Sequence, residues 1–445
     1  MKVQLLTLAV ATALASGSAL ATNGYAMHGV GIHAKGMGGA SIALPQDAVS
    51  IGQNPAASAV VGNRVDVGLD VFRPMRDAEL SETGLNPCPA PGFCPPPGFS
   101  NGKFDGSESE WFFIPEAAYN RVIDSKWSAG VSLYGNGGMN TDYGDGGIPL
   151  FNGGTGADSG INLQQMFIVP TFAYKIDEKN SVGFGANIVA QGFKAYGLQS
   201  FAGQPLPFPG VPYFSTSPSN VTDNGTDWTW GLGFRLGWLG QVSDTVTLGA
   251  YYSSRTWMQE FDDYKGLFAE KGAFDIPQNF GVGIAVKATP QLTIAADVVY
   301  IDYSSIDSIN NPVGNFYNCP ALMGSNPNAC LGGDDGPGFG WDSQTIFKLG
   351  VQYAINNEWT VRGGWNYAKQ PIPESQTMFN VLAPGVVENH LSLGASWYLA
   401  KDQELTFQYT HAFETEVDGD FTPGFGTANI KMYQDSFGVQ YSWKM

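Results

Sequence analysis

The sequence predicts an all-β protein, a 14-stranded antiparallel transmembrane β-barrel with an N-terminal hatch in the lumen. Segments of alternating polarity recur through the chain, and very short connections between them alternate with very long ones. This parity places all tight turns at one end and all long loops at the other, as in membrane barrels, where closure satisfies every backbone polar group. The composition agrees, with 58 glycines, 13% aromatic residues and only 14% charged residues.

Residues 1–21 have the pattern of a signal peptide. Lys2 supplies a positive charge, Val3–Leu14 is mostly apolar, and Ala19-Leu20-Ala21 matches a small-residue cleavage site, so we expect the mature chain to begin at Thr22. No later run reaches 18 apolar residues, which argues against a transmembrane helix. The strand pattern then indicates an outer membrane of the Gram-negative type.

Residues 22–62 do not have a strand pattern and are predicted to form the hatch. Several glycines interrupt any long strand there, and Asn54-Pro55-Ala56 is a turn or helix-start signal. We therefore expect three parts in the chain: signal peptide 1–21, hatch 22–62 and barrel 63–445.

The strands of the barrel follow in order. The first is expected at about Arg64–Phe72, and the last has Phe437, Tyr441 and Trp443 on one face with small and polar residues on the other. Six tight turns separate successive strand pairs: 123–125, 177–179, 243–244, 289–290, 356–357 and 401–402. The long connections are expected at 73–110, 137–161, 195–226, 262–277, 304–342, 371–386 and 417–429.

One long loop is unusually apolar. The stretch 195–216 interleaves prolines with large apolar side chains, among them Phe201, Phe208, Tyr213 and Phe214. A concentrated apolar surface on a loop marks a binding site, so these four residues are candidates for ligand capture. The alternative is a loop that packs onto itself, and one loop can do both.

The four cysteines form two local pairs. Cys88 and Cys94 lie in one Pro-rich loop segment, and Cys319 and Cys330 lie in another. Because exported proteins meet an oxidising environment, proximity favours the disulfides Cys88–Cys94 and Cys319–Cys330. Metal binding is less favoured, since no histidine accompanies either pair.

Several strands carry a cation on the lumen-facing side. These are Arg235, Lys287, Lys348 and Arg362. They are candidates for contact with a ligand carboxylate. The alternative is pairing with acids of the hatch or wall, because an unpaired buried charge is costly.

Other functions find little support in the sequence. A net charge of −18 argues against a nucleic acid partner, which needs clustered Lys and Arg. His411 lies on the lipid-facing side of its strand, whereas Ser392 and Ser396 of the preceding strand face the lumen, so no hydrolase site is expected. We expect no enzyme, no cofactor and no metal. The acidic loops are interpreted as solvated, with divalent-cation bridging to outer-membrane lipid as the alternative.

The sequence resembles that of the FadL-type long-chain fatty acid transporters, a family that also includes channels for aromatic hydrocarbons. The resemblance is carried by Gly24-Tyr25, Gly36-Met37-Gly38-Gly39-Ala40, Asp47-Ala48, Asn54-Pro55-Ala56, Pro115–Tyr119, Pro170–Ile176, Ser253-Ser254-Arg255 and Trp359–Gly364. Two positions depart from the family pattern. Ala57 stands where Gly often follows the hatch motif, and the chain ends at Met445 instead of Phe.

The resemblance implies capture of an apolar ligand by external loops, transfer to an internal pocket and exit through a gap beside a kinked strand. It places Asn54, Pro55 and Ala56 opposite that kink, and the kink itself at Gly135, Gly137 and Gly138. The expected partners are a long-chain fatty acid or another hydrophobic small molecule, and outer-membrane lipid around a monomeric barrel. An alkane or aromatic hydrocarbon channel, a general porin and a surface adhesion barrel are the alternatives.

Overall fold

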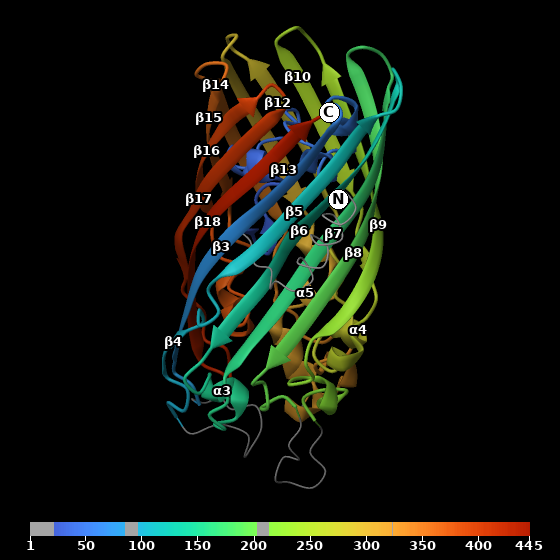
Figure 1. Ribbon diagram of the computed structural model, residues 1–445. Helices are drawn as coiled ribbons and strands as arrows, with labels where there is room; N and C mark the ends of the chain where they lie inside the picture. Colours follow the sequence, from blue (N-terminus) through green and yellow to red (C-terminus); the bar gives the residue numbers. More distant parts are fainter. Residues whose placement is uncertain (1–21, 85–96, 203–212, 323) are drawn as a thin grey trace.

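The computed structural model describes residues 22–84, 97–202, 213–322 and 324–445, which form a closed antiparallel β-barrel (Figure 1). One sheet contains 18 strands, and four short ones, β1 (Thr22–Asn23), β2 (Ala26–Met27), β4 (Gly102–Asp105) and β11 (Trp257–Met258), are additions to the wall. The remaining fourteen form the barrel, which closes where the last strand pairs with the first from Thr427↔Ser81 to Lys444↔Arg64. The predicted fold class is confirmed.

The wall strands are long and tilted. Their bounds are β3 (Arg64–Ser81), β5 (Phe112–Val122), β6 (Trp127–Tyr143), β7 (Ser159–Lys175), β8 (Asn180–Tyr196), β9 (Asp227–Gln241), β10 (Val246–Ser253), β12 (Asn279–Lys287), β13 (Leu292–Ile301), β14 (Gln344–Ala354), β15 (Trp359–Ala368), β16 (Asn389–Ala400), β17 (Gln403–Val417) and β18 (Thr427–Lys444).

The six predicted tight turns lie between β5 and β6, β7 and β8, β9 and β10, β12 and β13, β14 and β15, and β16 and β17. The connections at the opposite end are long and carry the short helices α3 (Pro149–Asn152), α4 (Ala269–Gly272), α5 (Asp307–Asn310) and α6 (Thr377–Asn380). They also carry the 3₁₀ helices η3 (Pro218–Asn220), η4 (Asp262–Tyr264), η5 (Tyr303–Ser305), η6 (Val313–Asn318), η7 (Pro320–Leu322), η8 (Pro327–Ala329) and η9 (Glu374–Gln376). Figure 1 shows α3 and α4 at the end away from the C-terminus.

The two faces of the wall differ as a membrane barrel requires. Large apolar side chains point outward, and several are about half exposed or more, such as Leu232, Val282 and Leu393. Inward-facing positions of the same strands are polar and buried, including Asp66 and Asp70 on β3 and Gln408 on β17. In the described part of the chain, no helix has the length and apolar character needed to cross a membrane.

Two strands extend further than the sequence predicts, and β10 ends earlier than predicted, at Ser253. β3 continues past Phe72 to Ser81, and β6 continues through the glycines to Tyr143. Both extensions lie toward the long loops, where β3 pairs with β18 and β4 and β6 pairs with β7. These parts lack a continuous apolar outer face, so the alternation that marks a membrane strand is absent from them.

The N-terminal segment, residues 22–62, lies inside the barrel, where it is drawn in blue in Figure 1. It contains α2 (Ile32–Lys35) and the 3₁₀ helices η1 (Val49–Gly52) and η2 (Pro55–Ala59). Nearly all its side chains are buried, and its backbone approaches the wall closely at glycines of opposing strands, such as Gly364 beside Met37. The small residues of the wall therefore make room for a packed interior.

The long loops pack over the barrel mouth into an aromatic core. Phe316, for example, packs against Phe214 and Phe379 at ring separations of 5.7 and 6.0 Å. The predicted disulfide Cys319–Cys330 is formed within this core. The predicted Cys88–Cys94 pair and the signal peptide lie outside the described residues and remain predictions.

Replacing both Cys319 and Cys330 by serine should destabilise the loop core while the barrel still assembles. The disulfide spans 11 residues of sequence, and closing a loop of that size contributes roughly 2–3 kcal/mol on the chain-entropy model. Protease resistance of residues 302–343 should fall, with heat-modifiability of the barrel retained. Non-reducing peptide mapping of the wild type that links Cys319 to Cys88 or Cys94 would contradict the pairing.

Candidate functional site

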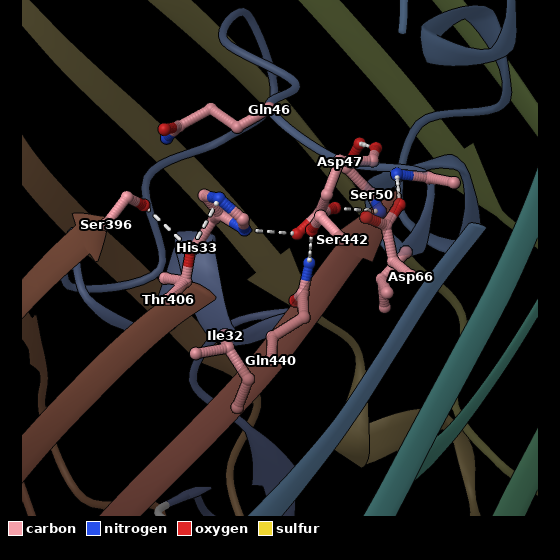
Figure 2. Close-up of polar contacts among 12 residues, drawn as sticks. Ile32, His33, Gln46, Asp47, Ser50, Asp66, Ser396, Thr406, Gln440 and Ser442 are labelled. Atoms are coloured by element: carbon pink, nitrogen blue, oxygen red, sulfur yellow. Dashed lines mark hydrogen bonds and ion pairs between the residues drawn. The ribbon is translucent and has the colours of Figure 1, made fainter. Parts of the chain in front are cut away.

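A buried charged network holds the N-terminal segment against the wall. The imidazole of His33 lies between two carboxylates, with Nδ1 2.9 Å from Asp47 Oδ2 and Nε2 2.8 Å from Glu404 Oε1 of β17 (Figure 2). Thr406 of the same strand is 3.1 Å from Nε2. All four side chains are buried, so the protonated ring bridges the segment and the wall.

The opposite side of the segment is bound to β3. Lys35 Nζ donates to Asp70 Oδ2 at 2.5 Å, in an ion pair buried from solvent. Arg64 donates to both oxygens of Asp66, and Asp66 Oδ2 also accepts the Ala48 N–H at 2.7 Å. Pairing of this kind offsets the desolvation of the inward-facing charges.

Three of the four predicted lumen cations also contact the N-terminal segment. Lys348 Nζ donates to the His28 carbonyl at 2.8 Å, and Arg235 Nη1 donates to the Gly52 carbonyl. Arg362 donates to Gln46 Oε1 at 2.9 Å and to Ser396 Oγ at 2.7 Å. Lys287 lies at the turn end of β12, where its side chain is exposed, and its contact with a ligand carboxylate remains a prediction.

The Asn54-Pro55-Ala56 motif has a structural position different from the predicted one. The Asn54 carboxamide accepts the Ala56 N–H and donates to the carbonyls of Ile42 and Trp238. It thus caps η2 and joins it to β9. Its predicted hydrogen bonds to the kinked strand are replaced by these contacts, because η2 packs beneath Gly183 and Gly237.

The wall has a seam between β5 and β6. Their ladder runs from Val122↔Ser128 to Ala117↔Leu133 and ends there, although both strands continue. Beyond this point the residues 112–116 of β5 pair with β3, and β6 follows β7 through a register shift between Gly135 and Gly137. The predicted kink at these glycines therefore coincides with an interrupted ladder.

The start of the N-terminal segment, and not Asn54, contacts the kink. Ala26 pairs with Gly137, and the Gly138 N–H donates to the Tyr25 carbonyl at 3.2 Å. A Cβ added at Gly137 would collide with the Tyr25 carbonyl oxygen. Glycine is thus required here by the close approach of two backbones.

An apolar cavity lies within the loop core. Ser308 contributes its only polar side chain among the described residues. Its walls come from five long loops and the ends of two strands, with Phe151, Phe193, Leu198, Phe201, Phe268 and Phe379 among them. We call this space the outer cavity.

The predicted capture residues divide around the outer cavity. Phe201 lines it and stacks on Phe151 and Phe379 at ring separations of 6.2 and 6.0 Å. Phe214 is buried in the adjoining core, and Tyr213 is about half exposed. Phe208 lies outside the described residues. Both interpretations of this loop therefore hold in part, since Phe201 faces a cavity and Phe214 supports the core.

Two inner cavities flank the Tyr25–Ala26 segment. One is lined by Arg235 and Lys348, so the structure brings these two predicted cations together. The other lies between β3 and the kink of β6 and is lined by Arg76 and Gly138. We call them the lower and the upper inner cavity.

One loop segment, residues 380–385, contributes to the lining of both the outer cavity and the upper inner cavity. Leu382 lines the first and Ala383 the second. The segment is fixed to β6, because Tyr143 Oη donates to the Val381 carbonyl at 2.7 Å and Thr141 Oγ1 donates to the Leu382 carbonyl at 2.9 Å. We call this segment the partition.

Arg76 was missed in the sequence because it falls in a region assigned to a loop. Extending the alternation of β3 by four residues would have placed it on the lumen side with Asp66 and Asp70. The described ranges contain no group of three or more His, Cys, Asp or Glu side chains suited to a metal ion.

A closed barrel with a filled lumen, internal cavities and an interrupted wall ladder has the architecture of an outer-membrane channel. The model of the family described as outer membrane protein transport protein (OMPP1/FadL/TodX) matches residues 8–423, and the chain belongs to this family. Members are non-enzymatic outer-membrane transporters of hydrophobic compounds, so the predicted family, location and absence of catalysis are confirmed.

Solved structures share the fold. The toluene transporter TodX of Pseudomonas putida has a TM-score of 0.67 at 17% identity, covering 94% of this chain and 99% of that one. A Pseudomonas aeruginosa FadL homologue has a TM-score of 0.68 at 16% identity, covering 95% and 99%. An outer membrane protein of Neisseria meningitidis serogroup B is 21% identical over 253 residues, 48% of this chain, and the match spans 51% of that protein's length.

Hydrogen exchange of the N-terminal segment should depend on pH through His33. Burial would lower the pKa of His33, but Glu404 and Asp47 raise it above its usual value. Burial would raise the pKa of Asp47, but His33 lowers it below its usual value. His33 stabilises the folded state fully at pH values below the pKa that it has in the unfolded chain, and this stabilisation is lost as pH rises through its pKa in the folded state. The stabilisation from Asp47 is lost as pH falls through its lowered pKa in the folded state.

Protection factors in residues 22–62 should therefore be highest at mildly acidic pH and should fall toward alkaline pH. In His33→Gln this pH dependence should disappear. Lys35→Met is the matched control, because it removes a neighbouring anchor, the ion pair with Asp70, and should lower protection while the pH dependence through His33 is kept. A wild-type profile that is flat from mildly acidic to alkaline pH would exclude His33 as the anchor.

Proposed function

We propose that the protein takes up hydrophobic small molecules passively, with long-chain fatty acids as the leading substrate, and releases them sideways through the wall. The observation that carries this proposal is the seam between β5 and β6, which lies beside the upper inner cavity. A hydrophobic ligand gains nothing from release into water, because its apolar surface would be hydrated again. An exit into the bilayer avoids that step.

Capture is assigned to the outer cavity. Its aromatic lining offers apolar contact to a ligand arriving from outside, at about 25 cal/mol per Å² removed from water. From there the ligand passes the partition into an inner cavity, and residues 22–62 act as the hatch. The hatch fills the lumen, which disfavours a general porin, since that needs an aqueous channel.

The inner surface of the seam supports the exit route. Phe72, Phe112 and Ile114 form a buried apolar cluster there, with Met27 of the hatch packed against it. Met27 lines the lower inner cavity and Phe72 the upper one, so apolar contacts lead from both cavities to the seam. Such a surface suits an alkyl chain moving into the bilayer.

In the lower inner cavity Arg235 and Lys348 are the proposed carboxylate contacts, with Arg362 deeper in the hatch anchor. An aromatic or alkane cargo is the second candidate, supported by the nearly complete absence of polar groups in the outer cavity. We propose that the barrel acts as a monomer surrounded by outer-membrane lipid.

Replacing Phe201 and Phe379 by serine should weaken capture. Loss of two aromatic contacts corresponds to roughly tenfold or more in affinity. Uptake of radiolabelled laurate by cells at low concentration should fall, with normal barrel assembly. Phe99→Ser is the control, since Phe99 is exposed in another loop and does not line the cavity. Equal uptake by the double variant and the control would refute capture in the outer cavity.

Regularising the seam should block exit. In Gly137→Val with Gly138→Val, the side chain at 137 would displace the Tyr25 carbonyl from the kink. Uptake should be abolished while the barrel remains heat-modifiable and surface-exposed. Gly185→Val with Gly192→Val is the control for valine in a wall strand, because both positions lie in β8, whose ladder with β9 is unbroken. Wild-type uptake by the seam variant would favour passage along the barrel axis.

A further inference from the structure

We propose that a groove on the lipid-facing side of β5 and β6 binds a glycerophospholipid of the periplasmic leaflet, with its phosphate at Arg121 and one acyl chain directed toward the seam. The inference goes beyond the proposed transport function and does not rest on it, because it concerns the outer face of the barrel and needs no cargo. We call this space the wall groove, which is lined by Tyr119, Arg121, Ile123, Ala129, Gly130 and Val131.

A small side chain between larger ones produces the wall groove. Ala129 of β6 pairs with Arg121 on one side and with Phe172 of β7 on the other. Phe172 is 57% exposed and points toward lipid. Two residues further from the turn, Tyr119 pairs with Val131. The outer surface is therefore hollow at Ala129, and the hollow follows the direction of the strands.

Arg121 lies at the depth of the lipid headgroups. β5 ends at Val122, and the tight turn that follows lies on the periplasmic side, as in other membrane barrels. Trp127 and Tyr174 pair across β6 and β7 beside this turn, with their ring centres 4.7 Å apart. Such aromatic side chains mark the interface of a membrane barrel. A cation at this level therefore meets the phosphate groups of the periplasmic leaflet.

Arg121 lacks a protein partner in the part of the chain that the structure describes. Its side chain is exposed, and its guanidinium takes part in no hydrogen bond or ion pair with the described residues. Two other basic side chains of the outer face are paired, Arg73 with Glu110 at 2.6 Å and His411 with Asp435 at 2.9 Å. A charge that faces lipid needs a counter-ion, and an arginine fork matches a phosphate in charge and geometry.

The turn beside Arg121 adds a second cation. Lys126 Nζ donates to Tyr174 Oη at 3.4 Å and lies 5.8 Å from the centre of that ring. The carboxylate of Asp124 accepts the backbone N–H groups of Lys126 and Trp127, each at 2.8 Å, and so caps the turn. This end of the groove carries two basic groups and one acid, which favours an anionic headgroup such as phosphatidylglycerol.

The wall groove leads to the seam. β5 advances four residues from Arg121 to Ala117, the last position of the β5–β6 ladder. This distance is about 13 Å at about 3.3 Å per residue, close to the depth of one leaflet in an apolar band about 25 Å tall. Leu133, Met166 and Ala190 form an apolar cluster there, on the same face of the wall as Phe172. An acyl chain anchored at Arg121 therefore covers the interrupted ladder from the lipid side.

The test is native mass spectrometry of the full-length protein in detergent, with added phosphatidylglycerol or with a diacylglycerol of the same acyl chains that lacks the phosphate. The wild type should bind phosphatidylglycerol more tightly than diacylglycerol. Arg121→Gln should weaken phosphatidylglycerol binding about fivefold, the effect of one basic side chain at an anionic headgroup, and leave diacylglycerol binding unchanged. Arg121→Lys should retain part of the affinity, and Arg73→Gln should retain all of it.

A second pair of variants tests the groove and leaves the charge in place. Ala129→Phe fills the hollow and should weaken phosphatidylglycerol binding although Arg121 is present. Ala395→Phe is the matched control, because Ala395 lies on the outer face of β16 and does not line the groove. Both variants should remain heat-modifiable, since the added ring points into lipid. Equal binding by the two variants would overturn the groove as the site.

A phosphatidylglycerol with a photoreactive acyl chain locates the tail. Peptides that contain Leu133 or Met166 should be labelled in the wild type and should lose the label in Arg121→Gln. Equal phosphatidylglycerol binding by the wild type and Arg121→Gln, equal binding of the two lipids by the wild type, or label spread evenly over the barrel would overturn the inference. None of these results bears on uptake, so the proposed transport function stands or fails separately.

Discussion

Backbone hydrogen bonding around the barrel is the constraint on which the rest of this structure depends. In lipid each strand needs a neighbour on both sides, and thirteen of the fourteen strand junctions provide continuous or nearly continuous ladders. The β5–β6 junction provides one for only six residue pairs. There the hatch supplies a partner from inside, through Ala26 and the Tyr25 carbonyl. The interruption is thus tolerable only with the hatch in place.

The polar interior follows from the same arrangement. A lumen of this diameter must be filled or wet, and here it is filled by 22–62, whose own backbone groups need partners. Inward-facing side chains provide them: Asp66 accepts from Ala48, Asp297 from Ser41 and Ile42, and Lys348 donates to His28. Most buried wall charges therefore position the hatch. Arg76 is not used in this way, since its Nη2 donates to the Ser109 carbonyl of a loop.

Much of the fold could be predicted from the sequence because its rules are local. Each tight turn is marked by Asp, Asn, Ser or Pro between alternating strands, and all six are where the pattern placed them. The second half of β3 was not predicted as a strand, because a strand in water has no lipid-facing alternation. For the same reason Arg76 was not recognised as a lumen-facing residue. The kink glycines were found, but their partner was not. Which part of the hatch reaches them depends on how the whole segment folds back, and spacing alone does not encode that.

β6 contacts the partition and also forms one side of the seam. Thr141 and Tyr143 connect the upper end of this strand to the loop that closes the outer cavity, and Gly137 and Gly138 lie a few residues below, at the seam. A cargo that pushes the partition aside would therefore strain the same strand whose kink forms the proposed exit. Displacement of the partition and opening of the seam would be mechanically coupled through β6. Such coupling would let the cargo itself open the wall and would keep the outer membrane sealed against solutes that never contact the partition.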